Sequence, residues 1–364
     1  MERIETANGV KRVVCIPGED AAPEAFEPAV ALIDRLKLPI EWLRPPVGES
    51  GAKLTGSTFP AQAREAIDSS DATFFGSASG PSTAALMYLR WGRRTYANVR
   101  PARWFPGCRS PLAHPETVDL VIVRENLEDL YVGVEGELDT LEPLGWMSRT
   151  ARVPVTTLGT GRYALKVITR EGTERVARFS YELARRRRER GRPGTLTVGT
   201  KHNMLPRSDG LFREVVLDLA QSYPDVPVQS YIVDDLACRL IMEPQRHDVV
   251  LLPNLYGDVL SDAAAGTIGG LGLAPSGCYG DDYAYFESAH GTAPDIAGQH
   301  IINPTATLLS GALMLEYLGF MNEARALERG VERVYAEGRT LTPDQGGRAT
   351  TDEMCEAVAR VMSV

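Results

Sequence analysis

The chain has 364 residues, of which 43% are hydrophobic, and a formal net charge of −9 at pH 7. This length predicts two domains or one large α/β unit, and the apolar content excludes a disordered chain. The negative charge argues against a protein that binds nucleic acids or membrane surfaces in general. The N-terminus has no apolar signal region, no apolar run is long enough to cross a membrane, and the five cysteines are scattered. A reduced, cytoplasmic protein is therefore expected.

Strand-like and helix-like patterns alternate in the first part of the chain. Residues 12–18 (RVVCIPG) and 71–77 (DATFFGS) are typical of buried strands, and residues 23–36 (PEAFEPAVALIDRL) are typical of an amphipathic helix. Strands that alternate with helices predict βαβ units and a parallel sheet.

The middle of the chain continues this alternation, with a long helix expected at residues 172–191. Further strands are expected at residues 118–126, 195–203, 228–235 and 248–254. The last part is largely helical, beginning at residues 304–320, and Thr350–Glu353 (TTDE) has the form of a capping box that opens a helix.

Two aspartates, Asp258 and Asp262, follow the strand expected at residues 248–254 and lie four positions apart. At that spacing both side chains project from one face of a helix, where like charges repel each other. A hard divalent ion such as Mg²⁺ prefers carboxylate oxygens, and open α/β sheets bind ligands at the carboxyl ends of their strands. The pair indicates a metal site, although acidic residues at a helix start also occur for their effect on the dipole alone.

Three arginines, Arg90, Arg100 and Arg124, lie in or beside apolar segments, and the last two each end a strand-like run. These two side chains are therefore expected to point into a cleft. Guanidinium groups bind carboxylates through paired hydrogen bonds, so three together suit a di- or tricarboxylate. Taken singly, each also fits a surface or ion-paired arginine.

Lys201 follows the strand-like run at residues 195–199 (TLTVG), and a lysine beside other cations can lose its proton and act as a base. A solvated lysine is the alternative. The loop at residues 287–304 (ESAHGTAPDIAGQHIINP) fits a backbone wrapped around a flat ligand, or an ordinary loop.

Two other motifs are interpreted as structural. Residues 159–164 (GTGRYA) precede a strand-like segment rather than a helix, so they do not form a dinucleotide fingerprint. Residues 185–190 (RRRRER) end a long helix, where cations favour the dipole and are expected to project into water rather than to bind nucleic acid.

Residues 254–277 (NLYGDVLSDAAAGTIGGLGLAPSG) and 290–298 (HGTAPDIAG) resemble the β-decarboxylating dehydrogenases, the family of isopropylmalate, isocitrate, homoisocitrate and tartrate or D-malate dehydrogenases. The resemblance covers nearly the whole chain. It implies an α/β isocitrate/isopropylmalate dehydrogenase-like fold with a large coenzyme-binding domain built from residues 1–101 and 254–364. Residues 102–253 would form a smaller domain whose arm clasps a partner, giving a homodimer, or a tetramer, with shared active sites.

The resemblance also implies roles for individual residues in oxidative decarboxylation of a 2-hydroxy acid. Tyr131 and Lys201 match the catalytic residues, and the substrate-binding residues would be Arg90, Arg100, Arg124 and Asn203. Asp234 would join Asp258 and Asp262 in binding Mg²⁺ or Mn²⁺. In the family dimer, Lys201 and Asp234 complete the site of the neighbouring subunit.

The coenzyme positions of the family fall on the loop before the last helices. Asp295 and Ile296 match the positions that separate NAD from NADP users, and an aspartate there accepts a hydrogen bond from a ribose hydroxyl and repels a 2′-phosphate. NAD is therefore the expected coenzyme. The resemblance implies adenosine contacts from His290, Gly291 and Asn303, with Glu287 nearby.

Substrate choice in the family depends on the helix before Arg90, where this chain has Thr83, Ala84, Leu86 and Met87. Apolar side chains cannot pair with a third carboxylate, which argues against isocitrate. An apolar 3-substituent is expected, with 3-isopropylmalate as the first candidate. Homoisocitrate and D-malate or tartrate stay open, because Thr83 replaces the glutamate typical of isopropylmalate enzymes and other segments match those branches.

The N-terminal loop departs from the family pattern, since G-D-G-I-G-P-E is replaced by GEDAAPE at residues 18–24. The loss of two glycines leaves open a homologue that binds a nucleotide or metabolite with weak or no turnover. A Mg²⁺-dependent hydrolase or phosphoryl-transfer enzyme would also use the aspartates, but the chain has no P-loop and that reading leaves the arginines unexplained.

Overall fold

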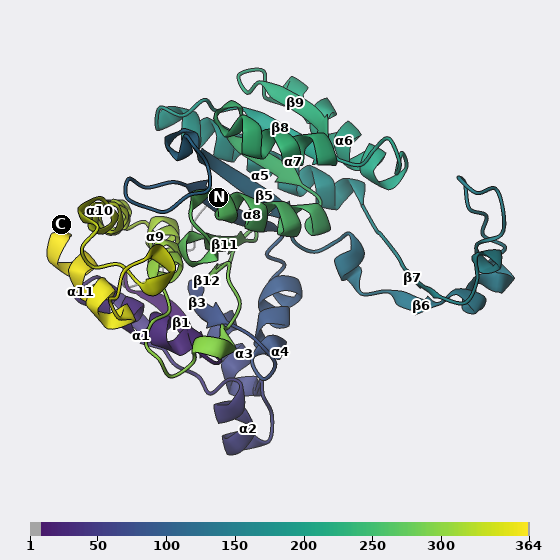
Figure 1. Ribbon diagram of the computed structural model, residues 1–364. Helices are drawn as coiled ribbons and strands as arrows, with labels where there is room; N and C mark the ends of the chain where they lie inside the picture. The colour runs from purple at the N-terminus through teal and green to yellow at the C-terminus, as the bar shows by residue number, and fades with distance from the viewer. Residues whose placement is uncertain (1–8, 363–364) are drawn as a thin grey trace.

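The computed structural model describes residues 9–362 (Figure 1). The strands are β1 (Lys11–Gly18), β2 (Ile40–Leu43), β3 (Ala72–Ser77), β4 (Ala97–Arg103), β5 (Asp119–Glu125), β6 (Glu135–Glu137), β7 (Arg162–Ala164), β8 (Leu196–Thr200), β9 (Val228–Ile232), β10 (Val249–Leu252), β11 (Pro275–Tyr279) and β12 (Ala284–Ser288). The α-helices are α1 (Ala22–Asp34), α2 (Glu49–Thr55), α3 (Ala61–Asp68), α4 (Thr83–Met87), α5 (Arg170–Glu189), α6 (Ser208–Leu219), α7 (Val233–Met242), α8 (Asn254–Ile268), α9 (Thr305–Leu318), α10 (Met321–Glu337) and α11 (Thr351–Val361). The α/β class is confirmed, and the strands expected near residues 12–18, 71–77, 118–126, 195–203, 228–235 and 248–254 correspond to β1, β3, β5, β8, β9 and β10. The helices expected at residues 23–36, 172–191 and 304–320 correspond to α1, α5 and α9.

One ten-stranded sheet runs through the molecule in the order β2-β1-β3-β12-β11-β4-β5-β10-β8-β9. The prediction of a parallel sheet is wrong at its centre, because β11 is antiparallel to both of its neighbours and β4 is antiparallel to β5. A parallel pair needs a crossover connection, usually a helix. β11 and β12 are joined by a short turn, and the segment between β4 and β5 contains no α-helix, so both pairs are antiparallel.

Strand alternation divides the apolar side chains between two faces of the sheet. On one face, Val13 and Cys15 of β1 and Val250 and Leu252 of β10 share a single core with α1, α7, α8 and α9–α11. On the other face, Val14 and Ile16 pack toward α3 and α4, whereas Val249 and Leu251 pack toward α5 and α6. Both faces are therefore covered by helices, as expected for an α/β protein.

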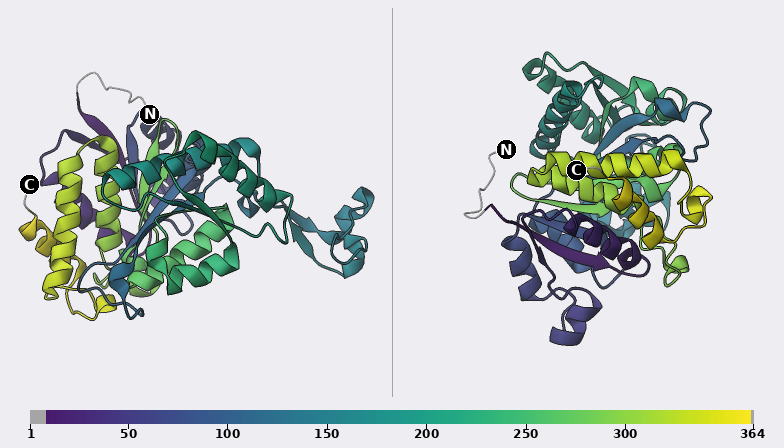
Figure 2. Two further views of the ribbon diagram at one scale, coloured as in Figure 1. Left: turned by 90° about the horizontal axis from the view of Figure 1, so that it is seen from above. Right: turned by 90° about the vertical axis from the view of Figure 1, so that its left-hand side faces the viewer.

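A thin arm that includes β6 and β7 projects away from the body of the molecule (Figures 1 and 2). Its exposed large apolar side chains include Leu144, Trp146, Met147 and Leu158. Exposed apolar side chains of this kind are typical of surfaces that contact another protein chain. The clasp of a partner and the domain borders at residues 101 and 254 stay predictions.

The capping box at the start of α11 is confirmed, since Thr350 and Glu353 each accept a hydrogen bond from the other's backbone N–H. The solvated interpretation of residues 185–190 is wrong for Arg187, which is 14% exposed and pairs with the buried Asp248 at 2.5 Å. α5 lies against the sheet, so one arginine near its C-terminal end faces inward. No helix in the described residues is long and apolar enough to span a membrane.

Candidate active site

Two of the predicted arginines lie on one face of the sheet because of the register of β4 and β5. Arg100 is opposite Ile122, and Arg124 lies two residues beyond Ile122, so both side chains leave the sheet on the same side. The expectation that Arg100 ends a strand is wrong, since it lies in the middle of β4. Both side chains nevertheless meet α8, which packs across β4 and β5.

The aspartates of α8 point at these arginines. Nη1 of Arg100 lies 3.4 Å from Oδ1 of Asp258, 3.2 Å from Oδ1 of Asp262 and 2.8 Å from the hydroxyl of Ser261. Arg124 donates from Nη1 to the same oxygen of Asp258 and from Nε to Asn254 at 2.7 Å. The helical spacing of the two aspartates therefore does bring both carboxylates to one face.

The arginines are buried and their hydrogen-bonding capacity is not exhausted. Arg124 is 1% exposed and Arg100 is 8% exposed. Nη2 of Arg124 and Nε of Arg100 are buried and have no partner within the described residues. Burial, followed by the charge of Arg100, lowers the pKa of Arg124, while the Asp258 carboxylate raises it. Unpaired buried guanidinium N–H groups are costly, which indicates a place for an acidic ligand.

Tyr131 joins this cluster from the root of the arm, where Leu130–Val132 form a turn of 3₁₀-helix. Its hydroxyl donates to Oδ2 of Asp258 at 2.6 Å, and the guanidinium of Arg124 lies 4.9 Å from its ring centroid. Burial and the hydrogen bond to Asp258 raise the pKa of Tyr131. The phenol therefore keeps its proton at neutral pH and faces the same carboxylate as the arginines.

Arg90 reaches the cluster from a π-helical turn, Tyr88–Gly92, that continues α4. Such turns are rare and are frequent at functional sites. Its Nε lies 3.2 Å from the hydroxyl of Tyr285, and its Nη2 lies 3.8 Å from Oε1 of Glu287. Burial raises the pKa of Glu287, and the charges of Arg90, Arg100 and Arg124 oppose that rise. The three predicted arginines thus act on one small region.

The residues predicted to select the substrate lie on α4, just before Arg90. Leu86 packs partly against the core beside β1 and β3, whereas Met87 is 37% exposed. Thr83 accepts a hydrogen bond from the backbone of Gly80, so its hydroxyl is engaged within its own turn. The side chains free to meet a ligand from this helix are mainly apolar.

Lys201, Asn203 and Asp234 lie away from this cluster in the same chain. Lys201 follows β8 and binds Asp234, at the start of α7, with 2.5 Å between Nζ and Oδ1. This contact lowers the pKa of Asp234, and Asn203 is exposed. No hydrogen bond or ion pair of the described residues joins Lys201 or Asp234 to Asp258 or Asp262. Among these residues, no group of three or more His, Cys, Asp or Glu side chains is placed to hold a metal ion.

Most of the predicted coenzyme residues lie on the loop between β12 and α9, and Glu287 lies in β12 itself. Nδ1 of His290 contacts the carbonyl of Gly291 at 2.8 Å, while its buried Nε2 has no partner within the described residues. Burial lowers the pKa of His290, which favours the neutral ring. Asp295 is exposed, and Ile296 packs toward Ala21.

Asn303 differs from the other predicted coenzyme residues because its side chain is fully engaged. Its amide donates to Tyr335 and Asp344 and accepts from the backbone of Thr305, at 2.9–3.0 Å. A contact between Asn303 and adenosine would therefore come from its backbone.

Lys166, Asp129 and Asp209, which sequence reasoning did not identify, link the start of α8 to the backbone beside Lys201. Nζ of Lys166 lies 2.6 Å from Asp209 and 3.3 Å from Asp129, and both aspartates are fully buried. Asp129 accepts from the backbone of Leu255 at the start of α8, and Asp209 accepts from the backbone of Lys201. The scarcity of lysine in the chain was the one available signal for Lys166.

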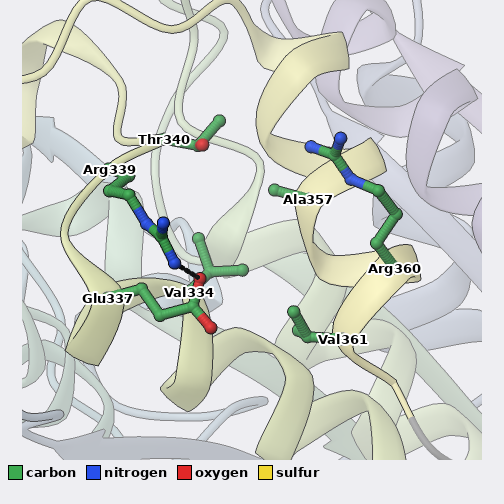
Figure 3. A pocket seen from close by; sticks show the side chains of 7 residues that line it. All are labelled: Val334, Glu337, Arg339, Thr340, Ala357, Arg360 and Val361. Atoms are coloured by element: carbon green, nitrogen blue, oxygen red, sulfur yellow. Dashed lines mark hydrogen bonds and ion pairs between the residues drawn. The ribbon is translucent and has the colours of Figure 1, made fainter.

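A surface pocket between α10 and α11 is separate from the candidate active site (Figure 3). Its lining residues are Val334, Glu337, Arg339, Thr340, Ala357, Arg360 and Val361. None of them is a predicted site residue, and Arg339 is already paired with Glu337.

Comparisons with known proteins agree with the resemblance. Residues 12–358 match the family described as isocitrate/isopropylmalate dehydrogenase. The chain is 40% identical to the 3-isopropylmalate/3-methylmalate dehydrogenase of Methanocaldococcus jannaschii, over 96% of this chain and 98% of the relative. It is 41% identical to an isocitrate/homoisocitrate dehydrogenase of Thermus thermophilus, over the same shares. The crystal structure of isocitrate dehydrogenase from Methylococcus capsulatus superimposes with a TM-score of 0.84 at 34% identity, over 97% of this chain and 99% of that one.

Proposed function

The chain belongs to the isocitrate/isopropylmalate dehydrogenase family, and from this premise we propose that it oxidises and decarboxylates a 3-substituted malate with NAD and a divalent metal. The observation that carries the proposal is the buried pair Arg100 and Arg124, each with a guanidinium N–H that has no partner among residues 9–362. Two such groups beside Arg90 suit a ligand with at least two carboxylates.

The residues present fit the two implied cofactors. Asp258 and Asp262 offer hard oxygen donors from one helix face, with side chains 33% and 48% exposed, as a site for Mg²⁺ or Mn²⁺ requires. Nε2 of His290, which has no partner within the described part of the chain, and the exposed carboxylate of Asp295 suit an adenosine and its ribose hydroxyls. When bound, NAD would accept the hydride from C2 and the metal would polarise the C2 oxygen.

The chain's own groups would bind the substrate and move its protons. The arginines would hold the carboxylates so that the bond to the departing CO₂ aligns with the C2 carbonyl. Tyr131, whose raised pKa keeps it protonated, would donate the proton that converts enol to ketone. Lys201 would accept the hydroxyl proton in the site of a neighbouring subunit, which Asp234 would complete as the third metal ligand. That arrangement requires a homodimer.

We favour a 3-alkylmalate, with 3-isopropylmalate first, because Leu86 and Met87 offer no partner to a third carboxylate and its desolvation would cost several kcal/mol. The relative named for 3-isopropylmalate and 3-methylmalate supports this choice. Homoisocitrate is the second candidate, supported by the similar identity to the isocitrate/homoisocitrate enzyme.

The test is NADH formation at saturating NAD and Mg²⁺ with 3-isopropylmalate, homoisocitrate and D-malate in parallel. The proposal expects the highest kcat/KM for 3-isopropylmalate. A preference for homoisocitrate would contradict the role given to Leu86 and Met87. Absence of turnover on every malate, with NAD binding retained, would instead identify a homologue that binds nucleotide without catalysis.

Asp295→Lys is expected to shift coenzyme preference toward NADP. The lysine replaces a group that would repel the 2′-phosphate with one that pairs with it, and a charged hydrogen bond of this kind changes kcat/KM by roughly 10- to 100-fold. The ratio of kcat/KM for NADP and NAD measures the effect. Glu65→Lys, the same charge change at an exposed position of α3, is the control and should leave the ratio unchanged. An unaltered ratio in Asp295→Lys would mean that Asp295 does not face the ribose.

A further inference from the structure

The altered N-terminal loop, residues 18–24, makes specific contacts with the segment that leads into α4. Oε2 of Glu19 accepts from the backbone N–H of Ser79 at 2.9 Å, and Oε1 accepts from that of Ser82 at 2.8 Å. Oε1 also accepts from the Ser82 hydroxyl, and Asp20 accepts from the Ser79 hydroxyl at 2.9 Å. One carboxylate therefore accepts from two backbone N–H groups of the turn that opens α4, those of Ser79 and Ser82, and the α4 N-cap residue itself provides no side-chain cap.

The surrounding backbone leaves room for this contact. Gly18 has φ +83°, and a Cβ there would lie 2.2 Å from the carbonyl oxygen of Ser77. A Cβ on Gly48, which has φ +68°, would press within 3.2 Å of both Oε1 of Glu19 and the Ser82 hydroxyl. Asp20 adopts φ +53°, a conformation that aspartate tolerates better than most residues. The loop is therefore closely fitted although it lacks two glycines of the family pattern.

The other end of the same loop holds the coenzyme loop. Glu24 accepts from the backbone N–H groups of Gly298 and His300, at 2.5 and 2.7 Å. The backbone of Ala21 donates to Thr292 at 3.0 Å, and Ala21, Ala25 and Ile302 form a small buried cluster with Ile296 packed against it. Residues 18–24 thus contact the substrate-selecting helix through Glu19 and the coenzyme loop through Glu24.

We infer that Glu19 is a positioning residue for substrate binding, one that fixes the first turn of α4 and thereby the placement of Met87 and Arg90. This inference rests on the proposed function. In Glu19→Gln, one of the two acceptor oxygens becomes an NH₂ group that faces a backbone donor. The turn then loses a charged hydrogen bond and gains a donor–donor contact, while Glu24 and the coenzyme loop keep their own contacts.

The expected result is a separation of the kinetic constants. Losing a charged hydrogen bond corresponds to a change of about 10-fold or more, which should appear in KM for the 3-substituted malate. KM for NAD and kcat should stay within about threefold, since the lost contact is not made to either reacting group. Glu19→Asp, which keeps the charge on a shorter side chain, should fall between wild type and Glu19→Gln.

Backbone hydrogen exchange of residues 78–86 without any ligand provides a second readout. Because Ser79 and Ser82 donate to Glu19, Glu19→Gln should accelerate exchange there and leave residues 292–300 unchanged. Glu49→Gln, which changes an exposed glutamate at the start of α2, is the matched control and should change neither readout.

Unchanged exchange and an unchanged substrate KM in Glu19→Gln would overturn the inference. Loss of kcat with KM unchanged would also overturn it. Absence of turnover in the wild type would overturn the proposed function instead, and with it the role of Glu19 in substrate binding.

Discussion

Asp258→Asn is expected to lower kcat by about 100- to 1000-fold, the range seen when one preorganised electrostatic group of an active site is removed. Asp258 accepts hydrogen bonds from Arg100 and Arg124 on one oxygen and from Tyr131 on the other. Asparagine has the same shape, but its nitrogen cannot accept, and it leaves the buried arginines with less opposing charge. It also removes one of the two hard oxygen donors proposed for the metal.

Steady-state kinetics with a titration of Mg²⁺ would measure the loss, and circular dichroism would establish that the variant stays folded. Asp225→Asn is a matched control, because Asp225 pairs with Arg185 at 2.6 Å on the exposed surface and neither residue is part of the candidate active site. It should keep wild-type kcat. Full turnover in Asp258→Asn would contradict both the metal assignment and the central place given to this carboxylate.

Lys166→Met is expected to reduce the free energy of unfolding by about 3–5 kcal/mol, as is usual when one partner of a buried ion pair is removed. The Lys166 side chain is 13% exposed, and Asp129 and Asp209 are fully buried. The two carboxylate oxygens that face Lys166 accept no hydrogen bond from other described groups. Burial lowers the pKa of Lys166, but Asp209 and Asp129 raise it by more, so the pKa is raised overall and the ammonium stays charged. Removing the ammonium leaves two buried carboxylates without their cation.

Unfolding of the wild type and of Lys166→Met in guanidinium chloride would measure the difference in their free energies of unfolding. Lys53→Met is the control, since Lys53 is 77% exposed and pairs with Glu49 on the same helix; it should change stability by less than about 0.5 kcal/mol. Adding Asp209→Asn to Lys166→Met should recover part of the loss. A Lys166→Met protein as stable as the wild type would mean that solvent reaches these carboxylates.

Patterns within short stretches of the sequence were sufficient to predict many of the helices and strands of this protein. The period of the apolar residues predicted the main strands and helices, and the spacing of Thr350 and Glu353 predicted a capping box that the structure contains. The four-residue spacing of Asp258 and Asp262 predicted their shared helix face. These features depend on backbone geometry within a few residues, so no knowledge of distant segments was needed.

Features that depend on pairing between distant segments were predicted less well. The antiparallel centre of the sheet goes with a short turn between β11 and β12 and a connection without an α-helix between β4 and β5, and the pairing of β4 with β5 places Arg100 in mid-strand opposite Ile122. The inward-facing Arg187 and the buried Lys166 likewise depend on which aspartates the fold brings beside them.

The sequence by itself determined the α/β class, the motif that identifies the family and the residue types of the site, because each is encoded in short stretches of chain. Only the tertiary structure decided which of those residues meet. It joined Arg100, Arg124 and Tyr131 to α8, placed Arg90 beside Glu287 of β12, left Lys201 paired with Asp234 elsewhere, and gave Glu19 its contacts with α4. The physical reason is that hydrogen bonds and ion pairs act over a few ångströms, and a sheet of mixed direction sets those distances between residues far apart in sequence.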